Sequence, residues 1–423
     1  MSIRLDRDNL KGYVGQKDIE AISDKIRKVH DNLEQKKGAG AEFTGWCDLP
    51  TRISDDLIKE LEDLGEEVRG YSDCIISIGI GGSYLGIRAA ENFLRGTKIP
   101  IFYAGLNMSV DYHYQLLEKI KNHNPTVVVI SKSGTTTEPA LAFRLIQNAL
   151  AEKYSQKEMK KRIICVTDES KGALRTIANK NGYRSYVIPD DVGGRFSLLT
   201  PVGLVPLALA GIDIKSMVEG AREGQRLYSK FDLKKNISYQ YAASRYLLYK
   251  QNKVIEVSAS FYDNLFYVLE WWKQLYGESE AKQGKGIFPA SLIMSTDLHS
   301  MGQLMQDGMR NVFETFIQIE QPDHSIKLPS VDGDLDGFNI VAGKDLNYVN
   351  VQAHKATAAA HYEGQVPNMT LYIEKGDAYH FGQLIYFYER GVAISGYLLK
   401  INPFDQPGVE AYKKKMFALL GKK

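Results

Sequence analysis

One segment of the sequence concentrates hydroxyl groups at the start of a predicted helix. The expected strand Thr126–Ile130 leads into Ser131-Lys-Ser-Gly-Thr-Thr-Thr-Glu-Pro139, which carries five hydroxyls and one lysine. Hydroxyls, unpaired N–H groups and the positive end of the helix dipole converge there, and together they suit a phosphate dianion. Simple N-capping is the alternative, but capping needs only one or two hydroxyls. We therefore favour a phosphate-binding loop.

A second loop is rich in glycine. Ser77-Ile-Gly-Ile-Gly-Gly-Ser83-Tyr-Leu-Gly follows a hydrophobic strand and precedes a helix. Glycines let backbone N–H groups approach an oxyanion closely. Gly79 and Gly81 match the start of the dinucleotide fingerprint, but Tyr84 stands at its third glycine, and the sequence has no G-x-x-x-x-G-K-[ST] run. The segment is either a ligand loop or a tight strand-to-helix turn, and it does not require a nucleotide.

Two carboxylates follow the clearest amphipathic helix of the chain. Apolar residues recur at helical spacing over Tyr262–Tyr276, and Gly277 can end that helix in a left-handed cap. Glu278 and Glu280 would then leave the helix C-terminus, exposed to a cleft or to solvent. The negative end of the helix dipole raises a carboxyl pKa and makes the carboxylate a better base for a carbon acid. Solvated loop charges remain the alternative.

An arginine stands where it can reach an oxyanion. Arg195 follows two glycines in Asp191-Val-Gly-Gly-Arg195-Phe-Ser, at the end of a predicted strand. Its guanidinium is suited to stabilise negative charge that develops on a substrate. An ordinary ion pair with Asp190 or Asp191 explains the same spacing equally well.

Two further segments carry a histidine and a lysine. Ser295-Thr-Asp-Leu-His299 predicts a capped helix start, with Leu298, Met301 and Met305 as its buried stripe and His299 beside it. A lone histidine at such a place is usually structural. Near the end of the chain, Asn402–Lys413 breaks a long apolar helix and starts another, and Lys413 begins a run of three lysines that is typical of a solvated helix face.

The eight histidines show no H-x-H or H-E-x-x-H spacing. A metal-assisted hydride shift therefore has no visible site, and we expect neither a metal nor an organic cofactor.

The elements that must position these segments alternate from about residue 70. Short β-branched runs alternate with amphipathic helices, an order that produces parallel sheets flanked by helices. We expect two α/β domains over residues 66–211 and 212–400, a charged helical segment over 1–65 that packs on the first domain, and a C-terminal helix over 401–423. The predicted strands are Cys74–Gly79, Ile99–Ala104, Thr126–Ile130, Arg162–Thr167, Ser185–Ile188, Val254–Val257, Ile287–Ile293, Phe316–Ile319 and Asn368–Ile373.

Composition excludes several classes of partner. The 423 residues carry a net charge of +2, which gives no long-range field to recruit nucleic acid or an anionic membrane. Cys47, Cys74 and Cys165 lie far apart and form no C-x-x-C pair, so we expect a reducing cytoplasm. The N-terminus lacks the apolar stretch of a signal peptide, and the apolar segment Val202–Ile212 is too short to span a bilayer.

Six segments, in this order, resemble the glucose-6-phosphate isomerase (phosphoglucose isomerase) family in its shorter bacterial form. The resemblance extends over most of the chain. It implies an α/β fold of two sugar-isomerase (SIS) αβα sandwich domains with mainly parallel sheets, and a homodimer in which the neighbouring subunit supplies His299 to each active site. The segments are Ile78–Gly86, Ser131–Glu138, Asp191–Ser197, Gly277–Glu280, Ser295–His299 and Phe404–Lys413.

The resemblance also implies residue roles in the reversible conversion of glucose 6-phosphate to fructose 6-phosphate, a step of glycolysis and gluconeogenesis. Glu278 would move the proton between C2 and C1, and Arg195 would stabilise the cis-enediolate. His299 and Lys413 would assist ring opening. The residues implied to bind the substrate are Gly82, Ser83, Ser131, Lys132, Ser133, Thr136, Gly194 and Gln406.

One residue departs from the family pattern, which usually has glycine where this chain has Ala281. If that position needs a positive φ angle, alanine strains it and displaces Glu278. The rival hypotheses are an amino-sugar phosphate isomerase, or a regulator that binds a sugar phosphate without turnover. Both would keep the hydroxyl loop, but a regulator has no reason to carry Glu278, His299 and Lys413 together. A nucleotide-dependent oxidoreductase is disfavoured because Tyr84 stands where the dinucleotide fingerprint has its third glycine.

Overall fold

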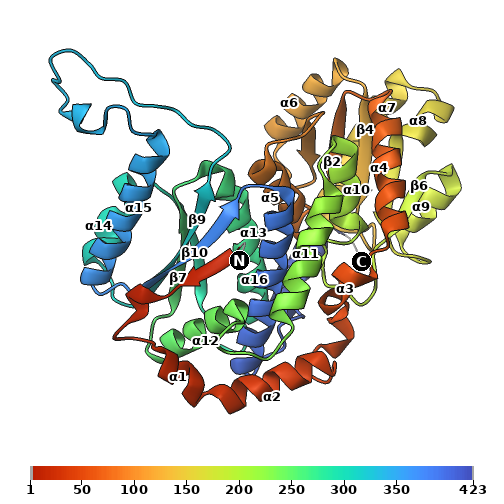
Figure 1. Ribbon diagram of the computed structural model, residues 1–423. Helices are drawn as coiled ribbons and strands as arrows, with labels where there is room; N and C mark the ends of the chain where they lie inside the picture. The colour runs from red at the N-terminus through yellow and green to blue at the C-terminus, as the bar shows by residue number, and fades with distance from the viewer. Residues whose placement is uncertain (1–2, 422–423) are drawn as a thin grey trace.

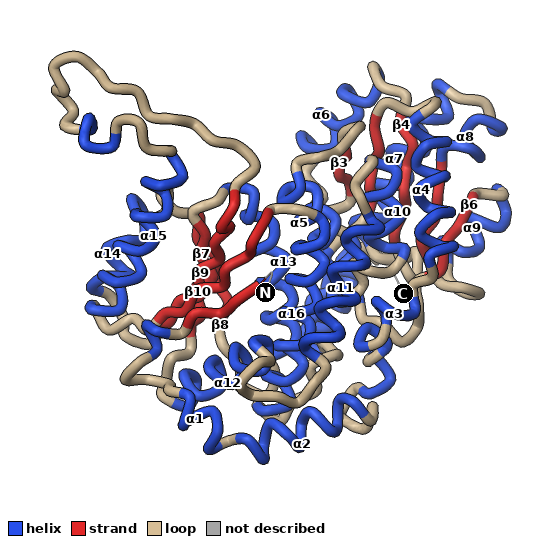
Figure 2. Tube along the Cα trace, viewed as in Figure 1, coloured by secondary structure: helices blue, strands red, loops and turns tan. Residues whose placement is uncertain are grey.

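The computed structural model describes residues 3–421, which form two five-stranded sheets with a layer of helices between them (Figure 1). Figure 2 shows the two sheets as two separate groups of strands. More helices cover the outer face of each sheet, so each half of the molecule is an αβα sandwich. The predicted fold class is confirmed.

The first sheet has the strand order β3-β2-β4-β5-β6, and all its strands are parallel. Alternate residues of its central strand enter two different cores. Val127 and Val129 belong to the core under the outer helices, whereas Val128 and Ile130 belong to the core that continues into the middle layer. A strand buried on both faces is expected to be continuously apolar, which is why the sequence run was visible. Its strands are β2 (Cys74–Ile78), β3 (Ile101–Ala104), β4 (Pro125–Ile130), β5 (Ile163–Thr167) and β6 (Arg184–Val187).

The second sheet has the order β1-β10-β9-β7-β8. Four strands are parallel and match the prediction, although β9 is longer than expected. The sequence missed β1, which pairs antiparallel with β10 at the sheet edge. Its strands are β1 (Ile3–Asp6), β7 (Ile255–Ser260), β8 (Phe288–Ile293), β9 (Val312–Gln321) and β10 (Asn368–Lys375).

The N-terminal segment contacts both halves of the molecule. Helix α4 (Asp55–Arg69) packs on α10 (Pro201–Ala210) of the first half, whereas α2 (Ser23–Glu34) packs on α16 (Ala378–Leu398) and β1 joins the second sheet. The prediction that residues 1–65 pack on the first domain is therefore wrong for β1 and α2. The reason is that a four-residue edge strand is specified by backbone pairing, which leaves little pattern in the sequence.

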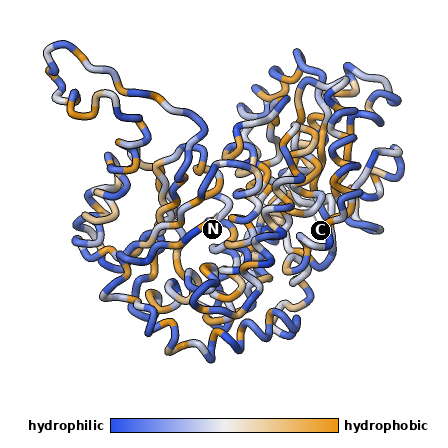
Figure 3. The backbone as a smooth tube through the Cα atoms, viewed as in Figure 1, coloured by the Kyte–Doolittle hydropathy of each residue, from blue (hydrophilic) through white to orange (hydrophobic). Residues whose placement is uncertain are grey.

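The middle layer brings two helices unusually close. A Cβ atom on Gly220 of α11 (Ile214–Tyr228) would lie 1.7 Å from the carbonyl oxygen of Tyr379, and one on Gly382 of α16 would lie 1.8 Å from that of Met217. Both positions therefore require glycine. Figure 3, in which the trace is coloured by residue hydropathy, shows hydrophobic residues concentrated along the strands and the inner helices. The remaining helices are α1 (Gln16–Ala21), α3 (Leu49–Arg52), α5 (Leu85–Leu94), α6 (Val110–Lys121), α7 (Thr137–Lys153), α8 (Gln156–Arg162), α9 (Ala173–Asn181), α12 (Ile237–Lys250), α13 (Phe266–Glu280), α14 (Leu298–Asp307), α15 (Leu346–Glu363) and α17 (Glu410–Leu419).

A long arm over residues 322–345 projects from the body between β9 and α15 (Figure 1). Within residues 3–421, every helix is too short or too polar to cross a bilayer.

The topology of the first sheet predicts where a ligand binds. From β2 the chain moves outward to β3, then returns to the other side of β2 and continues through β4, β5 and β6. The switch point therefore lies between the carboxyl ends of β2 and β4. Ligands of open α/β sheets bind at such points, and the glycine-rich and hydroxyl-rich loops both begin there.

His354 of α15 provides a pH test of how that helix packs on the second sheet. It is buried against the rings of Phe261 and Phe316, and burial lowers its pKa to about 4. Because the unfolded chain takes up the proton near the ordinary pKa, the contribution of His354 is complete above pH ~6.5 and is lost as the pH falls toward 4. We expect urea unfolding at pH 7 and pH 5 to show about 2 kcal/mol more acid destabilisation for the wild type than for His354→Asn. Equal pH dependence would contradict the assignment.

Candidate active site

Three loops meet at the carboxyl edge of the first sheet. They are the 3-10 turn η4 (Gly81–Ser83) after β2, residues 131–136 after β4, and the 3-10 turn η5 (Gly194–Phe196) after β6. The turns η4 and η5 touch, since a Cβ atom on Gly82 would lie 2.0 Å from the carbonyl oxygen of Gly194. Gly81 has a φ angle of +56°, which disfavours any residue with a side chain. These glycines bring two backbones together beside the hydroxyl loop.

The hydroxyl loop is folded by its own serines. Ser131 Oγ accepts a hydrogen bond from the Gly134 N–H at 3.0 Å, and Ser133 Oγ accepts one from the Thr135 N–H at 3.1 Å. Thr136 is the N-cap residue of α7, but among the described residues no N–H donates to its side chain. The capping alternative is therefore not supported at Thr136. Its hydroxyl and the first turn of α7 are available to an anion.

Lys132 is tied to the third loop. Its Nζ lies 2.6 Å from Asp190 Oδ1, where both side chains are substantially exposed. Asp191 pairs instead with Arg52, at 3.1 Å. Asp190 and Asp191, the two alternative partners that the sequence suggested for Arg195, therefore pair with other residues. An ion pair with either aspartate does not explain the position of Arg195.

Arg195 joins three distant segments of the chain. Its Nη1 donates to Gln406 Oε1 at 2.8 Å and to Glu278 Oε2 at 3.3 Å, and its Nε donates to Ser279 Oγ at 2.7 Å. Its Nη2 donates to the carbonyl oxygens of Pro403 and Asp405. Burial lowers the pKa of Arg195, and the Glu278 carboxylate opposes that shift. The guanidinium is held by five hydrogen bonds beside one carboxylate that a ligand can reach.

Glu278 lies in the last turn of α13 and not beyond it. The prediction that Gly277 ends the helix in a left-handed cap is wrong, because α13 continues to Glu280. The expected exposure of the following residues is wrong for Glu280, whose side chain is fully buried against Arg245, whereas that of Glu278 is 34% exposed. Side-chain bonds to the two arginines hold the additional residues in the helix.

Sequence reasoning missed three residues of this site. Gln274 lies one turn before Glu278 and donates to its Oε1 at 3.1 Å, so Arg195 and Gln274 hold one carboxylate oxygen each. Ser279 orients Arg195 as described. Lys282 is nearly buried and pairs with Asp405 at 3.0 Å, and burial lowers its pKa. Of the three, only Gln274 could have been found from the sequence, because it lies four positions before Glu278 and such residues are neighbours on a helix. That inference holds only if the helix continues past Gly277.

Ala281 introduces no backbone strain. Its φ angle is −78°, which any residue adopts. The conditional concern that alanine displaces Glu278 is therefore not supported.

Among the described residues, neither His299 nor Lys413 forms a hydrogen bond or an ion pair with Arg195 or Glu278. His299 is exposed in the first turn of α14; of the predicted stripe, Met305 is buried but Met301 is 36% exposed. The predicted stripe is therefore wrong for Met301. Lys413 lies one turn into α17, with its Nζ 2.8 Å from Glu410 Oε1. The same helix approaches the hydroxyl loop, since Phe417, Leu420, Ser131 and Thr135 line a common cavity of about 570 Å³.

Within residues 3–421, one group of three possible metal ligands comes together, namely Asp73, Cys74 and His123. It lies at the amino end of β2, opposite the edge that holds Arg195. The Asp73 carboxylate there accepts hydrogen bonds from the Asn124 N–H at 2.8 Å and from His123 Nδ1 at 3.3 Å. This group therefore ties a turn to the strand.

Two αβα units that carry a hydroxyl-rich loop, a partly exposed glutamate and a buried arginine at one sheet edge are the arrangement expected of a sugar-phosphate isomerase. Comparison with known proteins agrees. The family model described as phosphoglucose isomerase matches residues 64–419. The chain is 50% identical to the glucose-6-phosphate isomerase of Clostridium novyi, over 100% of this chain and 96% of that protein, and 48% identical to that of Acetivibrio thermocellus, over 99% and 96%. The chain belongs to the phosphoglucose isomerase family.

Solved structures agree with the fold. The chain resembles a hypothetical protein of Thermus thermophilus with a TM-score of 0.89 and 26% identity, over 99% of both chains. It also resembles a glucose-6-phosphate isomerase of Chlamydia trachomatis with a TM-score of 0.80 and 20% identity, over 96% of this chain and 86% of that one.

The contact of η4 with η5 can be tested by a matched pair of substitutions. Gly82→Ala places its Cβ against the Gly194 carbonyl and should destabilise the fold by about 1–3 kcal/mol, as overpacking does. Gly194→Ala is the control, because a Cβ there has no described heavy atom within 4 Å. Urea unfolding of both variants measures the difference. Equal stabilities would show that the two loops are not in contact.

Proposed function

We propose that the chain catalyses the reversible isomerisation of D-glucose 6-phosphate to D-fructose 6-phosphate, a step of glycolysis and gluconeogenesis. The observation that carries the proposal is the partly exposed Glu278 carboxylate held 3.3 Å from buried Arg195, in a chain of the phosphoglucose isomerase family. The reaction moves one proton from C2 to C1 and another from the C2 hydroxyl to the C1 oxygen. Substrate and product are therefore isomers, and no co-reactant is consumed.

Glu278 acts as the base in this proposal. Its carboxylate removes the C2 proton of the open-chain aldose, which gives a cis-enediolate, and the protonated carboxyl returns the proton to C1. Gln274 and Arg195 orient the two carboxylate oxygens. Arg195 also places fixed positive charge beside the oxygen on which negative charge develops. Such preorganised electrostatics can lower the barrier substantially without a metal.

In this proposal the three loops bind the phosphate end of the sugar phosphate, away from the reacting carbons. Ser83, Ser131, Ser133 and Thr136 supply hydroxyls for the 6-phosphate, and Gly82 brings a backbone N–H close to it. Gly194, Gln406 and Lys132 lie toward the sugar. Binding energy from a group that does not react serves to position the carbons that do. His299 and Lys413 are assigned to ring opening.

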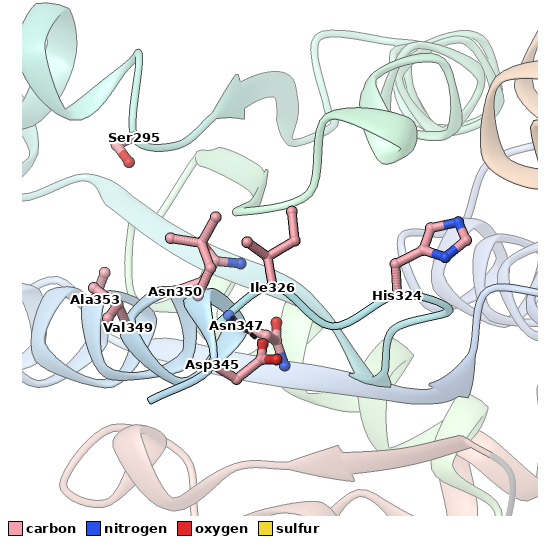
Figure 4. A pocket seen from close by; sticks show the side chains of 9 residues that line it. Ser295, His324, Ile326, Asp345, Asn347, Val349, Asn350 and Ala353 are labelled. Carbon is pink, nitrogen blue, oxygen red and sulfur yellow. Dashed lines mark hydrogen bonds between the residues drawn. The ribbon is translucent and has the colours of Figure 1, made fainter. Parts of the chain in front are cut away.

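We propose that the active form is a homodimer in which His299 acts at the neighbouring subunit's site. The arm carries five exposed apolar residues, and apolar surface of this extent marks an interface. Ser295, four residues before the exposed His299, and His324 of the arm line a cavity of about 430 Å³ (Figure 4). A second copy that covers this face would receive His299. The apolar residues of the arm are Ile326, Val331, Leu335, Phe338 and Ile340.

We place the protein in the cytoplasm. Cys47, Cys74 and Cys165 are all free, and two of them are buried as reduced thiols, which suits a reducing compartment.

An isotope experiment tests the reaction. Glucose 6-phosphate deuterated at C2, incubated with the protein in ordinary water, should give fructose 6-phosphate and lose part of its label to solvent. Glu278→Gln should still bind the substrate but lose most turnover, by about 10²–10⁴-fold, because only the base is removed. NMR follows both product and label. No product from the wild type would refute the reaction, and full activity of Glu278→Gln would move the base elsewhere.

Subunit complementation tests the shared site. His299→Ala and Glu278→Gln should each be nearly inactive, yet a mixture refolded together should recover about a quarter of wild-type activity, since half of the dimers are mixed and each has one intact site. Refolding each variant alone is the control. No recovery from a mixture that size exclusion shows to be dimeric would mean that His299 acts within its own subunit.

A further inference from the structure

A second arginine is buried close to the proposed base. Arg245 of α12 is fully buried and forms ion pairs with two fully buried carboxylates, Glu256 Oε2 at 2.5 Å and Glu280 Oε1 at 2.5 Å. Its Nη2 also donates to Glu280 Oε2 at 3.1 Å, and its Nη1 to Ser395 Oγ of α16 at 2.9 Å. Desolvation alone would lower the pKa of Arg245, but the two carboxylates raise it well above its ordinary value.

The two carboxylates come from different elements. Glu256 lies on β7, where Tyr241 and Thr315 also donate to it at 2.7 Å. Glu280 is the last residue of α13, two positions after Glu278. Arg245 therefore connects the end of the helix that carries the proposed base to a strand of the second sheet.

The last turn of α13 is held from two sides. Arg195 binds Glu278 and Ser279, whereas Arg245 binds Glu280. A terminal helical turn has carbonyl groups without helical partners and tends to fray. Gly277 lies within this turn and weakens it by about 1 kcal/mol relative to alanine. Two charged contacts on three consecutive residues oppose that tendency.

Stability alone does not explain the buried cluster. Replacing buried ion pairs by well-packed apolar side chains is often neutral or stabilising, because the charges must be stripped of water. What a buried, bidentate arginine provides is fixed geometry. The geometry fixed here is that of the helical turn on which Glu278 stands.

We propose that Arg245 and Glu280 are positioning residues that hold the last turn of α13 so that the Glu278 carboxylate meets the substrate carbons. Neither side chain touches the substrate, because both are fully buried. This inference rests on the proposed function, with Glu278 as the base. A misplacement of about 1 Å in such a group costs about 10²-fold in rate.

The chain offers a matched pair of variants. Glu280→Gln and Glu256→Gln each remove one carboxylate from the same buried arginine, but only the first lies on α13. Both should lower the unfolding temperature. At 25 °C, Glu280→Gln should lower kcat about ten- to a hundredfold with KM nearly unchanged, whereas Glu256→Gln should keep kcat within about twofold.

The isotope effect separates positioning from general damage. With substrate deuterated at C2, the effect on kcat should increase in Glu280→Gln, because proton abstraction becomes slower than the other steps, and stay at the wild-type value in Glu256→Gln. Adding Gly277→Ala to Glu280→Gln should restore part of kcat, since alanine strengthens the turn and its Cβ would meet Pro289 at an ordinary 3.5 Å. If Glu280→Gln does not fold, Glu280→Asp keeps a charge beside Arg245 and carries the same expectations.

The outcomes are distinguishable. A wild type that gives no fructose 6-phosphate refutes the proposed function. An active wild type with equal kcat losses and unchanged isotope effects in the two variants refutes the positioning role alone.

Discussion

The buried guanidinium of Arg195 is the interaction on which the proposed site depends. It binds the last turn of α13, the Gln406 side chain and the carbonyl oxygens of the loop that precedes α17. A cation removed from water at this depth is stable only if nearly all its donors are satisfied. The same requirement draws segments from both halves of the molecule to one point. One side chain thereby brings together the proposed base Glu278, the proposed sugar-binding residue Gln406 and the segment that leads into α17.

The two halves of the chain divide the work in a way that follows from their topology. The first sheet has its switch point between β2 and β4, where backbone N–H groups and hydroxyls suited to a phosphate gather. The second half contributes α13, which brings a carboxylate to the same edge from the middle layer. In the proposed mechanism, phosphate binding therefore belongs to the loops of the first sheet and proton transfer to a helix of the second half. The packing of α13 against α5 fixes how that helix lies relative to the first half.

Two buried arginines, one at each side of the last turn of α13, give that turn an unusual environment. The Glu278 side chain remains partly exposed while its neighbours Ser279 and Glu280 are buried. A base must be open to the substrate and yet immobile, and a helix end normally offers only the first of these properties. Charged contacts on the adjacent residues supply the second.

The sequence alone determined the fold class, nine of the ten strands among residues 3–421 and the family, because each depends on residue types within a few positions of one another. It also placed the glycine-rich and hydroxyl-rich loops after β2 and β4, and their binding of an anion stays a prediction. It did not determine that α13 passes Gly277, that β1 joins the second sheet, or which partners Arg195 binds. Arg195 meets Glu278 across 83 positions and Gln406 across 211. Local propensity carries no information over such separations, so those contacts were decided by how the two halves pack, and the burial of charge then selected the partners that could satisfy it.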